Sequence, residues 1–212
     1  GAVLGSKNLK AIAVVGTGKP AVARKEELTE LNKLSIKMSE RGTLRMPTPK
    51  KLIQYVKKAP CYQCGMDCLR GVFRTASGKE AIRKCQSLIF YMPYAFMRPD
   101  GDADTTVDAT ALCNEYSLCT MEMSNLIEWL AACHRAGVLT EEQIGLDMSD
   151  IGSVDFIRQL VTMIAKREGM GDVLAEGILR AGEKLGDATK AQFTDHMAGV
   201  VMTGAYAPRE YI

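Results

Sequence analysis

Three cysteines packed into eight residues are the side chains of this sequence with the clearest capacity for chemistry. They stand in the run Cys61-Tyr-Gln-Cys64-Gly-Met-Asp-Cys68. Thiolates this close together can converge on one metal centre, and Gly65 gives the loop the backbone freedom that it needs. The spacing C-x2-C-x3-C leaves one corner of a [4Fe–4S] cube, or one vertex of a zinc tetrahedron, to a ligand from elsewhere. The loop predicts an iron–sulfur or zinc site, with reduced structural cysteines or a disulfide as the alternatives.

Length and charge limit the classes of function. The chain has 212 residues, enough for one large or two small domains with a buried core. Its net charge is +2 and its basic residues are scattered, so we expect no nucleic-acid partner and no membrane surface. Seven cysteines without a secretory leader favour a reducing cytoplasm. Because the chain starts at Gly1 in a segment that resembles protein interior, we expect a piece of a larger polypeptide.

The elements that position these residues are expected to be mostly helical. An apolar run at 11–15, ended by Gly16 and Gly18, predicts the one convincing strand. Helical spacing of apolar residues predicts a helix at 24–40 and another after Pro49 that leads into the cysteine loop. Residues 85–104 are expected to be irregular. Further helices are predicted near 105–117, 121–136, 140–143, 153–168 and 171–185, with a capping box opening the third of these.

Five segments occur in an order that is typical of one family. They are GAVLGSKNLKAIAV at 1–14, the cysteine loop at 61–68, LCNEYSLCT at 112–120, GMGDVLAEG at 169–177, and His196-Met-Ala-Gly199 followed by Tyr206-Ala-Pro208-Arg209. Together they resemble the tungsten-containing aldehyde ferredoxin oxidoreductases. The resemblance implies multi-helix domains preceded by one strand of an N-terminal β domain. It assigns 1–20 to the end of that pterin-binding domain, 21–150 to a helical domain with the cysteine loop, and 151–212 to an incomplete second helical domain.

The resemblance also implies cofactors and their ligands. Cys61, Cys64 and Cys68 match the first three ligands of the family's [4Fe–4S] cluster, and the fourth would lie beyond the end of this chain. Asn114, Leu118 and Cys119 match the first of two D-x-x-G-L-D/C segments that wrap a tungsten or molybdenum bis-pterin. Arg209 matches the YDPR segment. Asn114, Ser117, Cys119 and Ala198 depart from the family's usual Asp, Gly, Asp and Lys.

Three residues are candidates for the chemistry itself. His196 matches a family histidine near tungsten, where imidazole could exchange a proton with the substrate. Glu80 lies where the family places an active-site carboxylate. A surface histidine and a solvated glutamate are the alternatives. The thiol of Cys119 could bind the metal, as in the related tungsten-dependent benzoyl-CoA reductases, or could be a packing residue like Cys85, Cys113 and Cys133.

The predicted function is oxidation of an aldehyde to a carboxylic acid, with water as the oxygen source. The implied partners are a small aldehyde or aromatic substrate and ferredoxin or a similar electron carrier, and a homo-oligomer is compatible with the family. The segment alone is expected to be inactive. The alternatives are a benzoyl-CoA reductase-like subunit and a helical binding module with a structural zinc.

Overall fold

The computed structural model describes residues 2–18, 21–41, 53–59, 70–83, 90–99, 101, 103–193, 196–197 and 200–201. The chain divides into two compact units. One consists of Gly1–Met46 with Pro60–Cys68, and the other of Pro47–Ala59 with Leu69–Ile212. No helix within the described residues is both long and apolar enough to cross a membrane.

The first unit contains α1 (Ala2–Ser6) and α2 (Lys25–Arg41). The helix predicted at 24–40 is therefore confirmed as α2, whose first turn carries Glu26 and Glu27 at the positive end of the helix dipole. The strand predicted at 11–15 is wrong, because these residues are exposed and form no strand. A strand requires a neighbour for its backbone hydrogen bonds, and this segment pairs with no other strand in the part of the chain that the structure describes.

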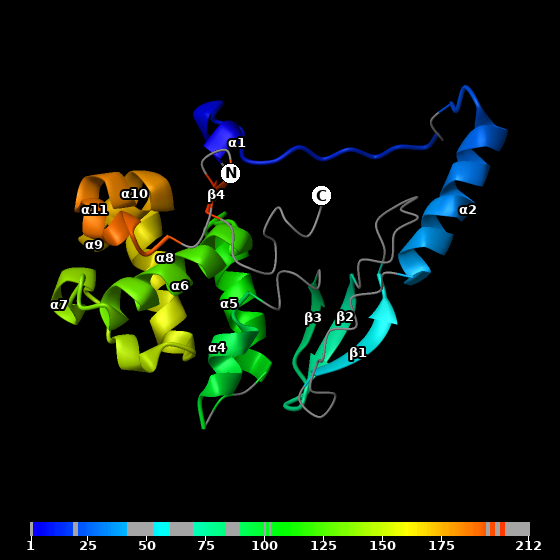
Figure 1. The fold of residues 1–212 in the computed structure, drawn as a ribbon. Coiled ribbons are helices and arrows are strands. Elements are labelled where there is room, and N and C mark those ends of the chain that lie inside the picture. Colours follow the sequence, from blue (N-terminus) through cyan, green and yellow to red (C-terminus); the bar gives the residue numbers. More distant parts are fainter. Residues whose placement is uncertain are drawn as a thin grey trace. The chain divides into compact units, whose positions relative to one another are not determined.

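The second unit begins with an antiparallel sheet that the sequence did not predict. Its order is β1 (Ile53–Lys58), β2 (Gly71–Thr75) and β3 (Glu80–Arg83), drawn from cyan to teal in Figure 1. The helix expected after Pro49 is wrong, since Tyr55 and its neighbours instead pair with β2. The rings of Tyr55 and Phe73 lie 5.3 Å apart at such a cross-strand pair. Pairing between strands has here overridden a short helical pattern.

One face of this sheet packs against α4 (Met92–Met97) and α5 (Ala103–Glu115) through Phe73, Ala81, Met92, Ala103 and Val107. Polar contacts also connect the β2–β3 turn to α5. Ser77 Oγ donates to a carboxylate oxygen of Asp104 at 2.6 Å, and Lys79 forms an ion pair with Asp108. The hydrogen bond and the nearby Lys79 charge lower the pKa of Asp104 against the effect of burial. The hairpin is therefore held on the first half of α5.

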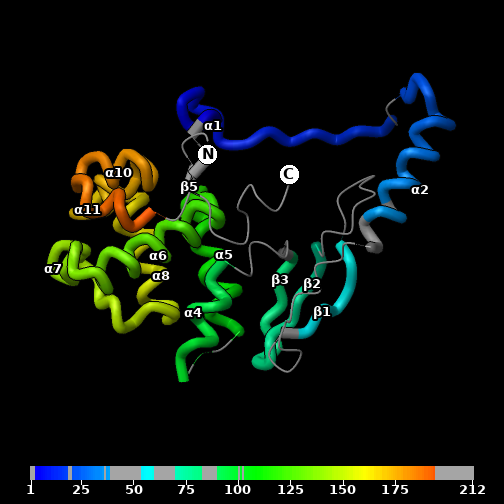
Figure 2. The backbone as a smooth tube through the Cα atoms, in the orientation of Figure 1, coloured from blue at the N-terminus to red at the C-terminus, as the bar shows by residue number. Residues whose placement is uncertain are grey.

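The remaining helices form the main hydrophobic core. They are α6 (Thr120–Arg135), α7 (Glu141–Ile144), the 3-10 helix η1 (Met148–Asp150), α8 (Val154–Lys166), α9 (Met170–Leu174), α10 (Ile178–Leu185) and α11 (Asp187–Lys190). Figure 2 traces the backbone through them from green to orange. The core includes the fully buried Ile127, Leu130, Ile157, Leu160 and Ile178. The mostly helical prediction is confirmed. This core runs across residue 150, and a domain division there stays a prediction.

Local signals located several helix boundaries correctly. Thr140 and Gln143 form the predicted capping box of α7, and the Ser153 hydroxyl caps α8. Two expectations differ from the structure. The stretch predicted to be irregular contains α4, and the helix expected at 171–185 is divided into α9 and α10. The division falls at Gly177, whose φ of 87° and ψ of 160° lie outside the helical region.

The fully buried Tyr91 joins α4 to the start of α8. Its hydroxyl donates to the Ser153 carbonyl oxygen at 2.8 Å and accepts from the Gly152 N–H at 3.1 Å. Burial raises the pKa of Tyr91, so the hydroxyl stays neutral and can fill both roles. Tyr91→Phe would leave the buried Gly152 N–H and the part-buried Ser153 carbonyl oxygen without this partner. We expect the free energy of unfolding to fall by about 1–3 kcal/mol in chemical denaturation.

The matched control for this prediction is Tyr116→Phe, because Tyr116 is 37% exposed. That change should alter the free energy of unfolding by less than about 0.5 kcal/mol. Equal effects of the two substitutions would show that the Tyr91 hydroxyl does not stabilise this contact.

Candidate functional site at the start of α6

The segment LCNEYSLCT forms the turn between α5 and α6. The Leu118 N–H donates to the Cys113 carbonyl oxygen at 2.8 Å, and the Ser117 N–H donates to that of Asn114 at 3.2 Å. These two bonds define a Schellman motif, in which the residue at the Ser117 position takes the left-handed conformation. Ser117 has a φ of 58°. The turn therefore favours glycine at this position for a conformational reason.

Cys119 lies at the end of this turn as the N-cap residue of α6. Its backbone is extended and its side chain makes no capping hydrogen bond. The thiol is exposed, whereas that of Cys113 is buried. Burial, with a smaller contribution from the charge of Cys119, raises the pKa of Cys113 to about 12. Of these two cysteines, Cys119 is the one available as a soft ligand or nucleophile.

The turn also fixes the two other residues assigned to the pterin segment. Leu118 is partly buried and packs against the main core, which anchors the turn. Asn114 is exposed in the last turn of α5. Asn114, Leu118 and Cys119 therefore lie in one segment, which consists of the last turn of α5, the connecting turn and the start of α6. An amide and a thiol on the same turn offer hydrogen bonding and soft coordination.

Glu122 is a polar residue of this site that the sequence did not single out. It is half-buried in the first turn of α6, and its Oε1 accepts from the Ile178 N–H at 3.3 Å. Burial raises the pKa of the Glu122 carboxyl, and the hydrogen bond from Ile178 opposes this increase. One local signal could have identified it. Glu122 occupies the glutamate position of a capping box whose N-cap residue is a cysteine, a poor partner for such a box.

The segment GMGDVLAEG shapes the neighbouring helices. Gly169 has φ 55° and ψ −129°, a conformation available almost only to glycine. A Cβ at Gly171 would lie 2.1 Å from the carbonyl oxygen of Met163 in α8. Arg167 links the segment to the end of α8 through Asp172 at 2.7 Å and Glu176 at 2.5 Å. The segment therefore allows close packing of α9 on α8 and directs the chain into α10.

Glu80 comes from the sheet. It begins β3 opposite Arg74, and the Arg74 Nε donates to its Oε1 at 2.7 Å. Both side chains are exposed, so this pair is hydrated and adds little stability. A catalytic role of Glu80 stays a prediction, and such a role would require the carboxylate to be released from Arg74.

Several predicted site residues lie outside the described residues. These are the three cluster cysteines Cys61, Cys64 and Cys68, together with Arg209 and Cys85. The backbone of His196 is described in β4 (His196–Met197), which pairs with β5 (Val200–Val201), but its side chain is not. Within the described ranges, no three His, Cys, Asp or Glu side chains form a group suited to a metal ion. The cluster and His196 assignments stay predictions.

Two of the cysteines predicted to be packing residues are confirmed as such. Cys113 and Cys133 are completely buried in the main core.

His134 lies two residues before the C-cap of α6, and its Nδ1 is 3.3 Å from the Leu139 carbonyl oxygen. Its position in the last turn is favourable for interaction with the helix dipole.

The strained Ser117 gives a direct test of the turn. Ser117→Gly removes the steric cost of the left-handed conformation, and we expect an increase of about 1 kcal/mol in the free energy of unfolding. Ser124→Gly is the matched control, because Ser124 lies inside α6 and glycine there should reduce stability by about 0.5 kcal/mol. Opposite signs in urea denaturation would support the assigned turn. A loss of stability in both variants would contradict it.

Known proteins resemble this chain in sequence and in fold. The family model described as "Aldehyde ferredoxin oxidoreductase, domains 2 & 3" matches residues 21–212. A tungsten-containing aldehyde ferredoxin oxidoreductase of Pyrococcus horikoshii is 26% identical over 87% of this chain and 37% of its own length. The "Aliphatic sulfonate oxidoreductase, WOR-like subunit" of Pyrococcus furiosus is 27% identical over 99% of this chain and 40% of its own length. The chain thus spans less than half of these relatives.

A solved structure shares the fold. It is described as the active site complex BamBC of benzoyl coenzyme A reductase in complex with 1,5 dienoyl-CoA. The superposition covers 94% of this chain and 37% of the other, with a TM-score of 0.65 and 19% sequence identity. At this identity the similarity establishes the fold alone.

Proposed function

Because the chain belongs to the aldehyde ferredoxin oxidoreductase family, we propose that it carries the iron–sulfur loop and the pterin-facing α5–α6 turn of a tungsten or molybdenum oxidoreductase. The observation that carries this proposal is the exposed Cys119 thiol at the end of a turn with the two hydrogen bonds of a Schellman motif. The segment that contains this turn resembles the family's pterin segment. The proposed reaction is the two-electron oxidation of an aldehyde to a carboxylic acid. Electrons would pass through a [4Fe–4S] cluster to ferredoxin or a similar carrier.

The chemistry of the side chains fits these cofactors. Thiolates are the usual ligands of iron–sulfur clusters, and Cys61, Cys64 and Cys68 would supply three of them. Asn114 would offer its amide to a pterin, and Cys119 would offer sulfur to the metal. When bound, a tungsten or molybdenum bis-pterin supplies the two-electron redox chemistry.

The remaining proposals concern proton transfer and the redox environment of the protein. His196 would exchange a proton with the substrate, since imidazole titrates near neutral pH. Glu80 would serve as a second acid or base if the complete site separates it from Arg74. The protein would operate in a reducing, cytoplasmic environment, which suits a cluster held by thiolates.

A second candidate is a benzoyl-CoA reductase-like subunit acting on an aromatic thioester. Cys119 favours it, because the resemblance places this cysteine where the aldehyde-oxidising enzymes commonly have aspartate. The superposition on a benzoyl-CoA reductase complex, with a TM-score of 0.65, adds only that the fold is shared. The two candidates share the cofactors and differ in the substrate.

The experiment that tests the proposal uses a longer polypeptide that contains this chain and has the length of its relatives, produced anaerobically in a host that makes the metallocofactor. Reduction of a viologen dye is followed with an aldehyde as the electron donor. In a separate assay the donor is a cyclic dienoyl-CoA, whose oxidation to the aromatic thioester is the reverse of the reductase reaction. Turnover with the aldehyde supports the first candidate, and turnover with the thioester supports the second. The 212-residue chain should be inactive with both. A metal-loaded longer polypeptide without either activity would overturn both candidates.

A further inference from the structure

We propose that Glu122 is a positioning residue for Cys119: it links the first turn of α6 to the first N–H of α10 and thereby fixes the helix start that presents the thiol. The functional meaning of Cys119 rests on the proposed function. The hydrogen bond itself does not depend on that proposal.

The contact replaces a helix cap that α10 lacks. The N-cap residue of α10 is Gly177, which has no side chain with which to cap it. Ile178, the first residue of the helix, is 1% exposed, and its hydrogen bond with Glu122 is part-buried. Glu122 Oε1 lies 3.3 Å from the Ile178 nitrogen and accepts its N–H from 56 residues away in sequence. A carboxylate at this end also interacts favourably with the positive end of the helix dipole.

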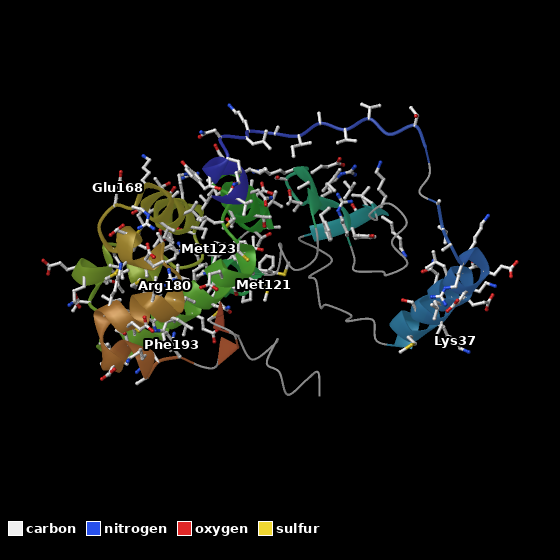
Figure 3. The ribbon with its side chains drawn as sticks, turned by 90° about the horizontal axis from the view of Figure 1, so that it is seen from above. Lys37, Met121, Met123, Glu168, Arg180 and Phe193 are labelled. Carbon is white, nitrogen blue, oxygen red and sulfur yellow. The ribbon has the colours of Figure 1, made fainter. Side chains whose placement is uncertain are left out.

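Glycine is favoured at position 177 by its φ of 87°, which is strained for any other residue. A Cβ there would lie 3.8 Å from Glu122 Oε1, an ordinary van der Waals distance. Met121 and Met123, labelled in Figure 3, precede and follow Glu122 at the start of α6. The glycine of one segment and the glutamate of the other therefore form one tertiary contact.

The Cys119 thiol has no capping role, and the Glu122 carboxylate accepts a hydrogen bond from α10. In a capping box, the residue at the Glu122 position reaches back to the N-cap N–H, and the N-cap side chain accepts in return. In this protein the Cys119 side chain makes no cap bond, and its carbonyl oxygen accepts the Met123 N–H at 2.9 Å. The Glu122 carboxylate instead joins the first turn of α6, which begins directly after Cys119, to the start of α10.

The test compares two substitutions in the complete polypeptide, purified without metallocofactor. Glu122→Gln keeps an acceptor of the same reach, and Glu122→Met removes the acceptor at similar length. Hydrogen exchange of the peptide that carries Ile178, and the rate of Cys119 alkylation by iodoacetamide, are both read by mass spectrometry. We expect Glu122→Met to speed exchange at this peptide about tenfold and to change the alkylation rate at least about threefold. Glu122→Gln should stay close to the parent for both.

Each outcome decides the proposal. Unchanged exchange in Glu122→Met would overturn the hydrogen bond, and faster exchange with unchanged alkylation would overturn the positioning of Cys119. If Glu122→Met loses protection throughout the helices, Glu122→Asp takes its place. This variant is one methylene shorter, and the same two selective changes are expected. Absence of tungsten and molybdenum from the loaded parent would overturn the proposed function but leave both of these readouts valid.

Discussion

Cys64→Ser in the complete polypeptide is expected to remove most of its cluster iron. A hydroxyl is a poor substitute for a thiolate, and Cys64 is the middle cysteine of the C-x2-C-x3-C run that is predicted to hold the cluster. A [4Fe–4S] cluster contains about four irons, so the iron content should fall from about four to below about one per chain after anaerobic reconstitution. The brown colour and the cluster absorbance should decrease with the iron.

The control for the cluster prediction removes a thiol outside the Cys61–Cys68 run. Cys133→Ala changes a fully buried cysteine in α6 that has no ligand spacing. This variant should keep its iron, with at most a modest loss of stability. Normal iron content in Cys64→Ser would show that the loop does not hold the cluster.

Gly171→Ala is expected to destabilise the fold strongly. The added Cβ would lie 2.1 Å from the Met163 carbonyl oxygen and 2.3 Å from its carbonyl carbon. These atoms belong to the backbone of α8 and cannot rotate away as a side chain could. Helix α9 would have to move off α8, and we expect a loss of about 3 kcal/mol or more in the free energy of unfolding. Chemical denaturation followed by circular dichroism measures this loss.

The matched change for this prediction is Gly18→Ala. Gly18 has no atom within 4 Å of an added Cβ, so the free energy of unfolding should stay within about 0.5 kcal/mol of the parent. If Gly171→Ala is as stable as Gly18→Ala, the close packing of α9 on α8 is contradicted.

The sequence predicted those elements whose signals are local. Thr140 and Ser153 cap α7 and α8 as expected, because a cap depends on residues only three positions apart. The sheet was missed, since β1 is stabilised by pairing with β2, which follows it in the sequence only after residues 59–70. Its short apolar pattern fits a helix or a strand equally well, and the partner decides between them.

The functional site, too, could be predicted from the sequence only where its signals are local. Resemblance to the family identified the turn from Asn114 to Cys119, and the Schellman hydrogen bonds supply the physical reason for its pattern. Glu122 was missed because its partner, Ile178, is 56 residues away. A contact of this kind depends on the packing of α6 against α10, and no local spacing indicates it. Gly171 belonged to a segment noted from the sequence, but its packing role required the structure.

Metal analysis of the complete polypeptide tests the central claim most directly. After anaerobic purification from a host that supplies the cofactor, we predict about four irons with equal acid-labile sulfide, and tungsten or molybdenum in near-stoichiometric amount. Zinc should be absent from the cysteine loop. One zinc per chain, with no iron, sulfide, tungsten or molybdenum, would contradict the account and would identify a helical module with a structural zinc site.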